Sequence, residues 1–251
     1  MTSLRSAWYV LTVIFVTAFC SLMVVVGAVF GVKYRKGGVY DQAARKWGTW
    51  LADLNGVGMR AEGLDHLSAD KSYVYIANHV SFSDMWVLCA LLPDSMRFVA
   101  KKELFDIPLF GHALKAARHI RIDRRNLQAA FGAYEEAGKA IQDGISAIVF
   151  AEGTRSRNGK LQPFKKGPFV LAIASKVEIV PVWLEGTYEA LPPGGRYVRP
   201  GMVTLRFGTP VPTAGLDYDD RDELTDKVRD QMIGLAGNSP YVRVDPAPVR
   251  G

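Results

Sequence analysis

The first feature of the hydrophobic pattern is an uninterrupted apolar run near the N-terminus. No charged residue occurs in residues 7–32, and a helix of that length would reach about 39 Å. A membrane-crossing helix needs only about 20 apolar residues, so the run predicts a transmembrane span or a re-entrant hairpin. A signal peptide is disfavoured, because the run is long and no A-x-A site follows it. Arg5 precedes the run, and Lys33, Arg35 and Lys36 follow it, which predicts a cytoplasmic C-terminal end.

A helical period follows in residues 39–58. Trp47, Trp50, Leu51 and Leu54 fall on one face of a helix with this period. Aromatic residues beside basic ones are typical of a helix that lies in a membrane interface. A helix packed on a globular domain has the same pattern, so both interpretations stay open.

Strand-like and helix-like patterns then alternate along the chain. Short apolar runs predict strands at residues 73–77, 97–100, 119–122, 146–150, 179–184 and 203–207. Helical patterns predict helices at residues 85–92, 109–116, 127–143, 169–176 and 220–235. This alternation indicates an α/β fold with a mostly parallel sheet flanked by helices. We therefore expect membrane-anchoring helices in residues 1–60 and one globular domain in residues 61–251.

Composition and charge narrow the class of partner. Apolar residues make up 49% of the chain and charged residues 22%, which is typical of a folded domain. The formal net charge of +6 favours an anionic partner, which could be a nucleic acid, a phospholipid headgroup or an acidic protein. A nucleic-acid-binding protein rarely needs so long an apolar segment, so the pattern favours lipid. The two cysteines lie far apart and predict no disulfide framework.

A polar motif, NHVSFSD at residues 78–84, directly follows the first of these predicted strands. Ser81 and Asp84 have the spacing of a helix-capping box, which leaves His79 unexplained. Ser81 and Ser83 lack the G-x-S-x-G context of a hydrolase nucleophile, and the histidines have no zinc-like spacing. The remaining interpretation is that His79 and Asp84 deprotonate a substrate hydroxyl, which then attacks an activated acyl group.

Two basic segments also lie beside predicted strands. In residues 149–167 an apolar strand runs into the sequence EGTRS, which is followed by further lysines and an arginine. Residues 100–111 and 120–125 supply a second group of cations. A solvated basic loop would have a similar composition. An arginine fixed at the end of a strand can instead bind a phosphate in bidentate fashion.

Taken in order, these motifs resemble those of the glycerolipid acyltransferases. The resemblance rests on N-H-x-x-x-x-D, K-x-E-L-x-x-x-P-x-x-G with I-D-R, E-G-T-R-S and V-P-V, and covers residues 60–210. Within that family the chain is most similar to bacterial 1-acyl-sn-glycerol-3-phosphate acyltransferases. Each motif would be weak evidence on its own, whereas the ordered set is specific.

The resemblance implies a role for each matching residue. It implies that His79 is the general base, that Asp84 orients it, and that Pro181 lies in the wall of an acyl pocket. The residues that it implies for substrate binding are Lys101, Arg124, Glu152, Gly153, Thr154 and Arg155. It implies no metal and no cofactor.

The implied reaction moves a fatty acyl group to the sn-2 hydroxyl of lysophosphatidic acid and gives phosphatidic acid for phospholipid synthesis. The co-substrate would be acyl-CoA or acyl carrier protein, and the partners would be membrane lipid rather than nucleic acid. The implied location is the cytoplasmic membrane, with the active domain facing the cytoplasm. Alternatives are acylation of another lysophospholipid or a lyso-ornithine lipid, or a membrane-tethered thioesterase.

Overall fold

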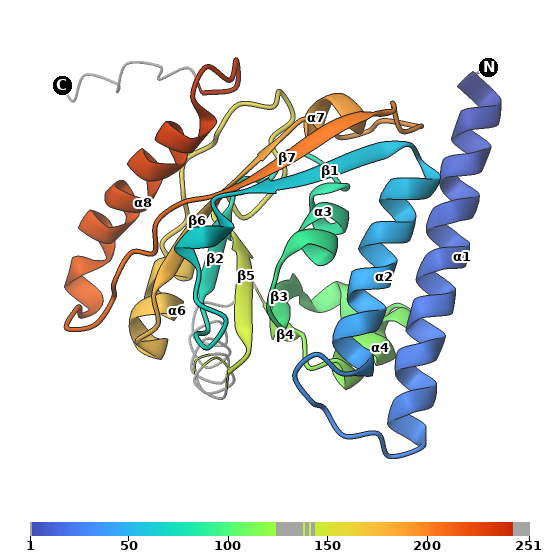
Figure 1. The fold of residues 1–251 in the computed structure, drawn as a ribbon, viewed down its shortest axis with the longest axis horizontal. Helices are drawn as coiled ribbons and strands as arrows, with labels where there is room; N and C mark the ends of the chain where they lie inside the picture. The colour runs from blue at the N-terminus through green and yellow to red at the C-terminus, as the bar shows by residue number, and fades with distance from the viewer. Residues whose placement is uncertain (1, 124–137, 139–140, 142–143, 243–251) are drawn as a thin grey trace.

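The computed structural model describes residues 2–123, 138, 141 and 144–242, and it has an α/β architecture (Figure 1). The strands are β1 (Val57–Glu62), β2 (Val74–Ala77), β3 (Met96–Lys101), β4 (Ile120–Ile122), β5 (Ser146–Phe150), β6 (Ile179–Glu185) and β7 (Gly201–Phe207). The α-helices are α1 (Thr2–Val29), α2 (Val39–Leu54), α3 (Asp84–Leu91), α4 (Phe110–Ala116), α6 (Gly167–Ser175), α7 (Thr187–Ala190) and α8 (Arg221–Ala236). Short 3₁₀ turns are η1 (Leu64–His66), η2 (Lys102–Asp106) and η3 (Tyr218–Asp220).

The strands of the described residues form one sheet in the order β1-β7-β6-β2-β5-β3-β4. Neighbouring strands from β6 to β4 run parallel, whereas β7 is antiparallel to β6 and parallel to β1. The prediction of a mostly parallel α/β sheet is therefore confirmed. Because β2, β5 and β3 run parallel side by side, their carboxyl ends meet at one edge of the sheet.

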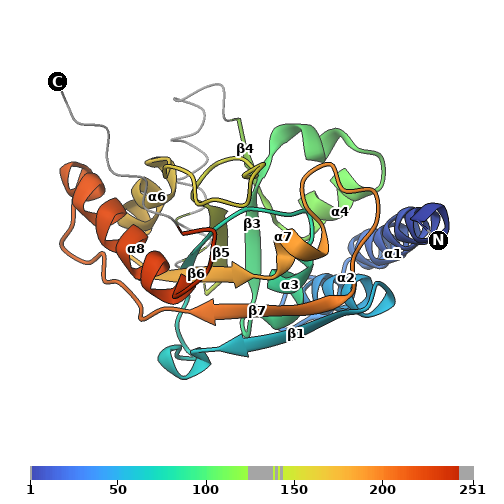
Figure 2. The same cartoon turned by 90° about the horizontal axis from the view of Figure 1, so that it is seen from above.

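Helices cover both faces of the sheet (Figures 1 and 2). On one face α3 packs on the strands and α2 packs on α3, and Trp86, Leu51 and Tyr75 are fully buried there. On the other face α6 and α8 bury Phe169, Trp183 and Val228 against the sheet, and Val228 lies on α8. β2 and β5 are fully buried along their length, which explains why their sequences are continuous apolar runs.

The helix α1 is long and apolar enough to cross a membrane, and it also packs against the globular part of the protein. Three hydrogen bonds join α1 to α2 and to the residue that follows α2. Trp8 Nε1 donates to the Leu54 carbonyl at 2.7 Å, and Trp47 Nε1 donates to Thr17 Oγ1 at 2.9 Å. The third runs from Asn55 Nδ2 to a threonine hydroxyl of α1. The N-terminal helices are thus docked rather than detached.

The structure corrects the sequence prediction between residues 39 and 62. The predicted helix ends at Leu54, and Val57–Glu62 form strand β1, which the sequence pattern did not predict. Of the two interpretations of this helix, packing on the domain is observed, although Trp50 remains partly exposed. The expected division at residue 60 falls inside β1. The predicted helix at residues 127–143 lies almost wholly outside the described residues.

Candidate active site

The NHVSFSD motif begins directly after β2, and the EGTRS motif begins two residues after β5. Ala77 at the end of β2 pairs with Phe150 at the end of β5, so the two motifs leave the sheet at the same level. Lys101 is the last residue of β3, which pairs with β5 on its other side. The sheet therefore brings three of the predicted segments to one edge, although they lie far apart in sequence.

The imidazole of His79 is held by the carboxylate of Asp84. His79 Nδ1 and Asp84 Oδ2 are 2.8 Å apart, and the His79 side chain keeps 14% of its surface exposed whereas Asp84 is fully buried. A carboxylate can only accept a hydrogen bond, so Nδ1 carries the proton and Nε2 is the nitrogen that can take a proton from a substrate. This is the geometry that a general base and its orienting acid require.

The loop between β2 and α3 is shaped by the same carboxylate. Asp84 Oδ2 also accepts the backbone N–H groups of Val80 and Ser81, both at 2.8 Å. Only this half of the predicted capping box forms, because Ser81 Oγ accepts the N–H of Ser83 instead. The hydroxyl of Ser81 donates to the Leu191 carbonyl, and both serines are fully buried. They are therefore structural residues of the loop and not accessible nucleophiles.

A stack of aromatic rings supports one face of the His79 imidazole. The ring of Phe150 lies parallel to it, with centroids 3.8 Å apart and an interplanar angle of 13°. Phe98 of β3 stacks in turn on Phe150 at 6.3 Å. No sequence pattern indicates this contact, because it depends on β2, β5 and β3 being neighbours in the sheet.

Glu152 is buried behind the His79 loop rather than placed in the open site. Its Oε1 accepts the backbone N–H of His79 at 2.7 Å, and its Oε2 accepts the N–H of Gln162 at 2.9 Å. The N–H of Ser156 donates in turn to the His79 carbonyl at 2.8 Å. Both carboxylate oxygens are thus bound to the backbone, which gives Glu152 a role in holding the two loops, and its implied role in substrate binding stays a prediction.

The cations expected to bind substrate lie on the exposed side of this edge. Gly153 has a φ of +71°, and the chain turns there so that Thr154 and Arg155 are exposed. No carboxylate of the described residues forms an ion pair with Arg155. Lys101 is also exposed at the end of β3. Arg124 lies outside the described residues, so its place in the site stays a prediction.

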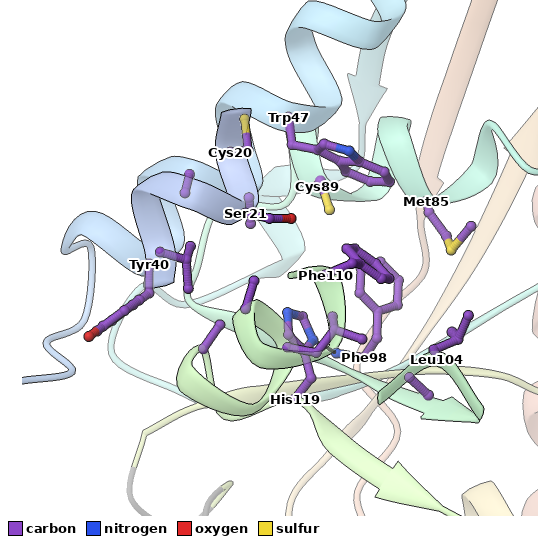
Figure 3. Close-up of a pocket in the computed structure, with 17 residues that line it drawn as sticks. Cys20, Ser21, Tyr40, Trp47, Met85, Cys89, Phe98, Leu104, Phe110 and His119 are labelled. Carbon is purple, nitrogen blue, oxygen red and sulfur yellow. Dashed lines mark hydrogen bonds between the residues drawn. The ribbon is translucent and has the colours of Figure 1, made fainter. Parts of the chain in front are cut away.

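An apolar cavity of about 110 Å³ lies between the N-terminal helices, α3, α4 and β3 (Figure 3). Figure 3 shows Met85 and Leu104 on one side of the cavity and Tyr40 on the other. Met85 directly follows Asp84, and Phe98 in the wall belongs to the aromatic stack under His79. Pro181 lies in β6 and is not among the residues that line this cavity, so its implied place in an acyl pocket stays a prediction.

His119 brings a polar ring into this apolar wall. Its Nδ1 accepts the backbone N–H of Phe98 at 3.1 Å. Burial, together with a smaller effect of the positive charge of Arg97, lowers the pKa of His119 to about 3. The ring is therefore neutral at physiological pH and does not place a charge in the cavity.

The buried Glu152 carboxyl should make the stability of the protein depend on pH. Burial raises its pKa to about 7, and the N–H groups of His79 and Gln162 offset part of that rise. The folded state then holds this proton more tightly than the unfolded state. Its stabilising contribution is complete below about pH 4.5 and is lost as the pH rises through about 7, which lowers the free energy of unfolding by up to about 3 kcal/mol.

Urea unfolding of the wild type and of Glu152→Gln at pH 5 and pH 7.5 measures this effect. We expect the wild type to lose stability between the two pH values and Glu152→Gln to lose much less. Glu103→Gln, which changes an exposed glutamate of η2, is the matched control and should behave as the wild type. An equal pH dependence in wild type and Glu152→Gln would contradict the assignment.

Comparison with known proteins gives concordant matches. A family model described as Acyltransferase matches residues 58–185. The chain is 36% identical over 203 residues to a 1-acyl-sn-glycerol-3-phosphate acyltransferase of Limnanthes douglasii. The matched region covers 80% of this chain and 70% of that protein. It is 34% identical over 182 residues to 1-acyl-sn-glycerol-3-phosphate acyltransferase alpha of Homo sapiens. This second match covers 72% of this chain and 64% of that protein.

A solved structure is similar over almost the whole chain. It is the crystal structure of the 1-acyl-sn-glycerophosphate (LPA) acyltransferase PlsC from Thermotoga maritima. The TM-score is 0.77 at 26% identity, and the match covers 94% of this chain and 96% of that chain.

Proposed function

Because the chain belongs to the acyltransferase family, we propose that it transfers a fatty acyl group from an acyl thioester to the sn-2 hydroxyl of 1-acyl-sn-glycerol-3-phosphate. The product is phosphatidate. One observation supports this most strongly. A histidine held by a buried aspartate lies between an exposed arginine-bearing loop and an apolar cavity. These three parts match the hydroxyl, the phosphate and the hydrocarbon of the substrates.

In the proposed reaction His79 acts as general base. Its Nε2 takes the proton of the sn-2 hydroxyl, and the hydroxyl oxygen forms a bond to the thioester carbonyl carbon. The tetrahedral oxyanion then collapses, the carbon–sulfur bond breaks, and the imidazolium returns the proton to the leaving thiolate. Asp84 stabilises the imidazolium in between. Lys101 or a backbone N–H group donates to the oxyanion, a contact that typically lowers a barrier by about 3–4 kcal/mol.

The acceptor phosphate is bound by the exposed cations at the carboxyl edge of the sheet. Arg155 follows the fixed turn at Gly153, so its guanidinium is available to two phosphate oxygens at once. Lys101 adds positive charge from β3. Binding of the phosphate fixes the glycerol hydroxyl near His79, and such positioning is a large part of catalysis in two-substrate reactions.

The apolar cavity suits the fatty acyl chain of a substrate. Its lining comes from α1, α2, α3, β3, η2 and α4, and almost every side chain in it is apolar. Two of its lining residues adjoin the site: Met85 follows Asp84 in the chain, and Phe98 stacks on Phe150, the ring under His79. An acyl chain in this cavity places the thioester carbonyl beside His79. The donor is acyl-CoA or an acyl carrier protein, and the net charge of +6 suits either of these anionic molecules.

The exposed face of α1 indicates where the enzyme meets lipid. Its exposed large apolar side chains include Trp8, Leu11, Phe15, Phe19, Leu22 and Val26. Their spacing places them along one side of the helix, and Cys20, Ser21 and Val24 on the other side line the cavity. If α1 left the globular part to cross the membrane, the cavity would lose the wall that α1 forms. We therefore propose that α1 lies along the cytoplasmic membrane surface with the globular part facing the cytoplasm.

The test is an assay with purified enzyme, lysophosphatidate and palmitoyl thioester, with phosphatidate as the readout. Phosphatidate formation that requires both substrates supports the proposal. A panel of other lysophospholipids and a lyso-ornithine lipid, each with the same donor, identifies the preferred acceptor. Thioester hydrolysis at an equal rate with and without any acceptor would instead identify a thioesterase.

Replacing Arg155 should weaken binding of the acceptor. We expect Arg155→Ala to raise the KM for lysophosphatidate by about tenfold or more, because a charge-assisted contact contributes about 1.5–3 kcal/mol. The donor KM should change little. Lys71→Ala is the control, because Lys71 pairs with Glu178 at the opposite edge of the sheet. Unchanged acceptor KM and kcat in Arg155→Ala would remove this residue from the site.

A further inference from the structure

The chain after α8 returns to the loop that carries Arg155. We refer to residues 151–166 as the basic loop and to residues 239–242 as the C-terminal strap. The N–H of Leu161 in the basic loop donates to the carbonyl of Tyr241 in the strap at 3.1 Å. Figures 1 and 2 show the red end of α8 running beside the yellow basic loop. The strap thus contacts the basic loop at Leu161, whereas the His79 loop contacts it at Ser156.

The side chain of Tyr241 fits closely against the basic loop. A Cβ atom built at Gly159 would lie 2.6 Å from two atoms of the Tyr241 ring, so only glycine allows the ring to approach so closely. Gly159 also has a φ of +78°, which favours glycine. The Tyr241 ring packs on Tyr188 at 5.3 Å, and its hydroxyl donates to Glu189 Oε1 at 2.7 Å.

Further contacts hold the same part of the basic loop. Tyr188, which packs on Tyr241, donates its hydroxyl to the Arg157 carbonyl at 3.1 Å. Ser239 Oγ in the strap donates to Glu185 Oε1 at 3.2 Å and so fixes the strap to the end of β6. From α8, Arg229 Nη1 donates to the Gln162 carbonyl at 3.0 Å.

The beginning of the basic loop is held differently. Glu152 and Ser156 are bonded to the backbone of His79, independently of the strap. The strap therefore acts on residues 157–161, which directly follow Arg155 and Ser156. A loss of strap contacts should loosen the cationic part of the loop more than the catalytic histidine.

We propose that Tyr241 is a positioning residue that holds the basic loop in the conformation that binds the acceptor phosphate. This inference rests on the proposed function, because it assigns the phosphate of lysophosphatidate to this loop. Tyr241 itself need not touch the substrate. It acts through Gly159, Leu161 and the Tyr188–Arg157 contact.

The readout is the separation of acceptor KM from kcat. We expect Tyr241→Ala to raise the KM for lysophosphatidate by about tenfold and to change kcat by less than about twofold. The variant loses the positioning of the basic loop but keeps the general base His79. Tyr241→Phe keeps the ring against Gly159 and loses only the Glu189 hydrogen bond. Its KM should stay within about threefold of the wild type.

A second variant approaches the same contact from the loop. Gly159→Ala should raise the acceptor KM in the wild-type background, because its Cβ displaces the Tyr241 ring. In the Tyr241→Ala background the same change should have a smaller effect, since the ring is absent. This non-additivity identifies the contact itself as the cause. If Tyr241→Ala does not fold, Gly159→Ala and Tyr241→Phe decide the question by their acceptor KM values.

Tyr218→Ala is the matched control, because Tyr218 lies in η3 at the other end of α8, with its ring over Arg221. Its acceptor KM should equal that of the wild type. The proposal is overturned if folded Tyr241→Ala and Gly159→Ala keep the wild-type KM, or if kcat falls while KM does not rise. If the wild type itself does not acylate lysophosphatidate, the result contradicts the proposed function and not the positioning role of Tyr241.

Discussion

Replacement of His79 by alanine should reduce kcat about 10²–10⁴-fold, which is the usual contribution of a positioned general base. The physical reason is that no other described side chain is held by Asp84 at this edge of the sheet. The substrate KM values should change little, because the phosphate and the acyl chain contact other residues. The measurement is steady-state acyl transfer by purified protein, together with thermal unfolding and vesicle binding of the same samples.

His66→Ala is the control for this experiment. His66 lies in η1, at the opposite edge of the sheet. Leu64 and Leu67, on either side of it, line a pocket together with Asp94 and Ser95, which precede β3. Its loss should leave acyl transfer unchanged. If His79→Ala retained turnover within about tenfold of the wild type, His79 would not be the base. An acyl-enzyme trapped on Ser81 or Ser83 would contradict direct transfer. The burial of both hydroxyls makes such an intermediate unexpected.

Replacement of Asp84 should have the second large effect, and two substitutions separate catalysis from folding. In Asp84→Asn, the amide oxygen can take the place of Oδ2 and accept the same three N–H groups, from His79, Val80 and Ser81. The fold should therefore survive. The negative charge that stabilises the imidazolium is lost, so we expect kcat to fall by about 10²-fold or more.

Asp84→Ala should lower both activity and stability. It leaves the ring N–H of His79 and two buried backbone N–H groups without their acceptor, and each unsatisfied buried group costs about 1–3 kcal/mol. The comparison of kcat and urea midpoint for the two variants tests the assignment. If Asp84→Asn were as active as the wild type, Asp84 would be only a structural residue of the loop. If it were as unstable as Asp84→Ala, its low activity would say nothing about catalysis.

The parts of the site that the sequence could predict are those within one motif. His79 and Asp84 are five residues apart, so a turn between a strand and a helix brings them together without help from the rest of the chain. The positions of His79 and Glu152 after apolar strands were also visible, because buried parallel strands have continuous apolar runs. These local patterns were enough to place both motifs at one edge of the sheet.

The parts that the sequence could not predict depend on which strands become neighbours. The stack of Phe150 on His79 requires β2 and β5 to be adjacent. Strand β1 was missed because its sequence, VGMRAE, is weakly apolar and its partner strand, β7, begins far along the chain at Gly201. The family resemblance implied substrate binding for Glu152, and it could not show that the fold turns both of its oxygens to backbone N–H groups.

The double role of α1 has a consequence for how fatty chains move. One side of this helix carries the exposed apolar residues, and its other side closes the cavity at Cys20 and Ser21. In the proposed orientation, the thickness of one helix separates the bilayer interior from the place where the new ester is formed. Desorption of a fatty chain into water costs about 0.8 kcal/mol for each methylene. We expect the finished diacyl product to pass sideways into the leaflet and so to avoid that cost.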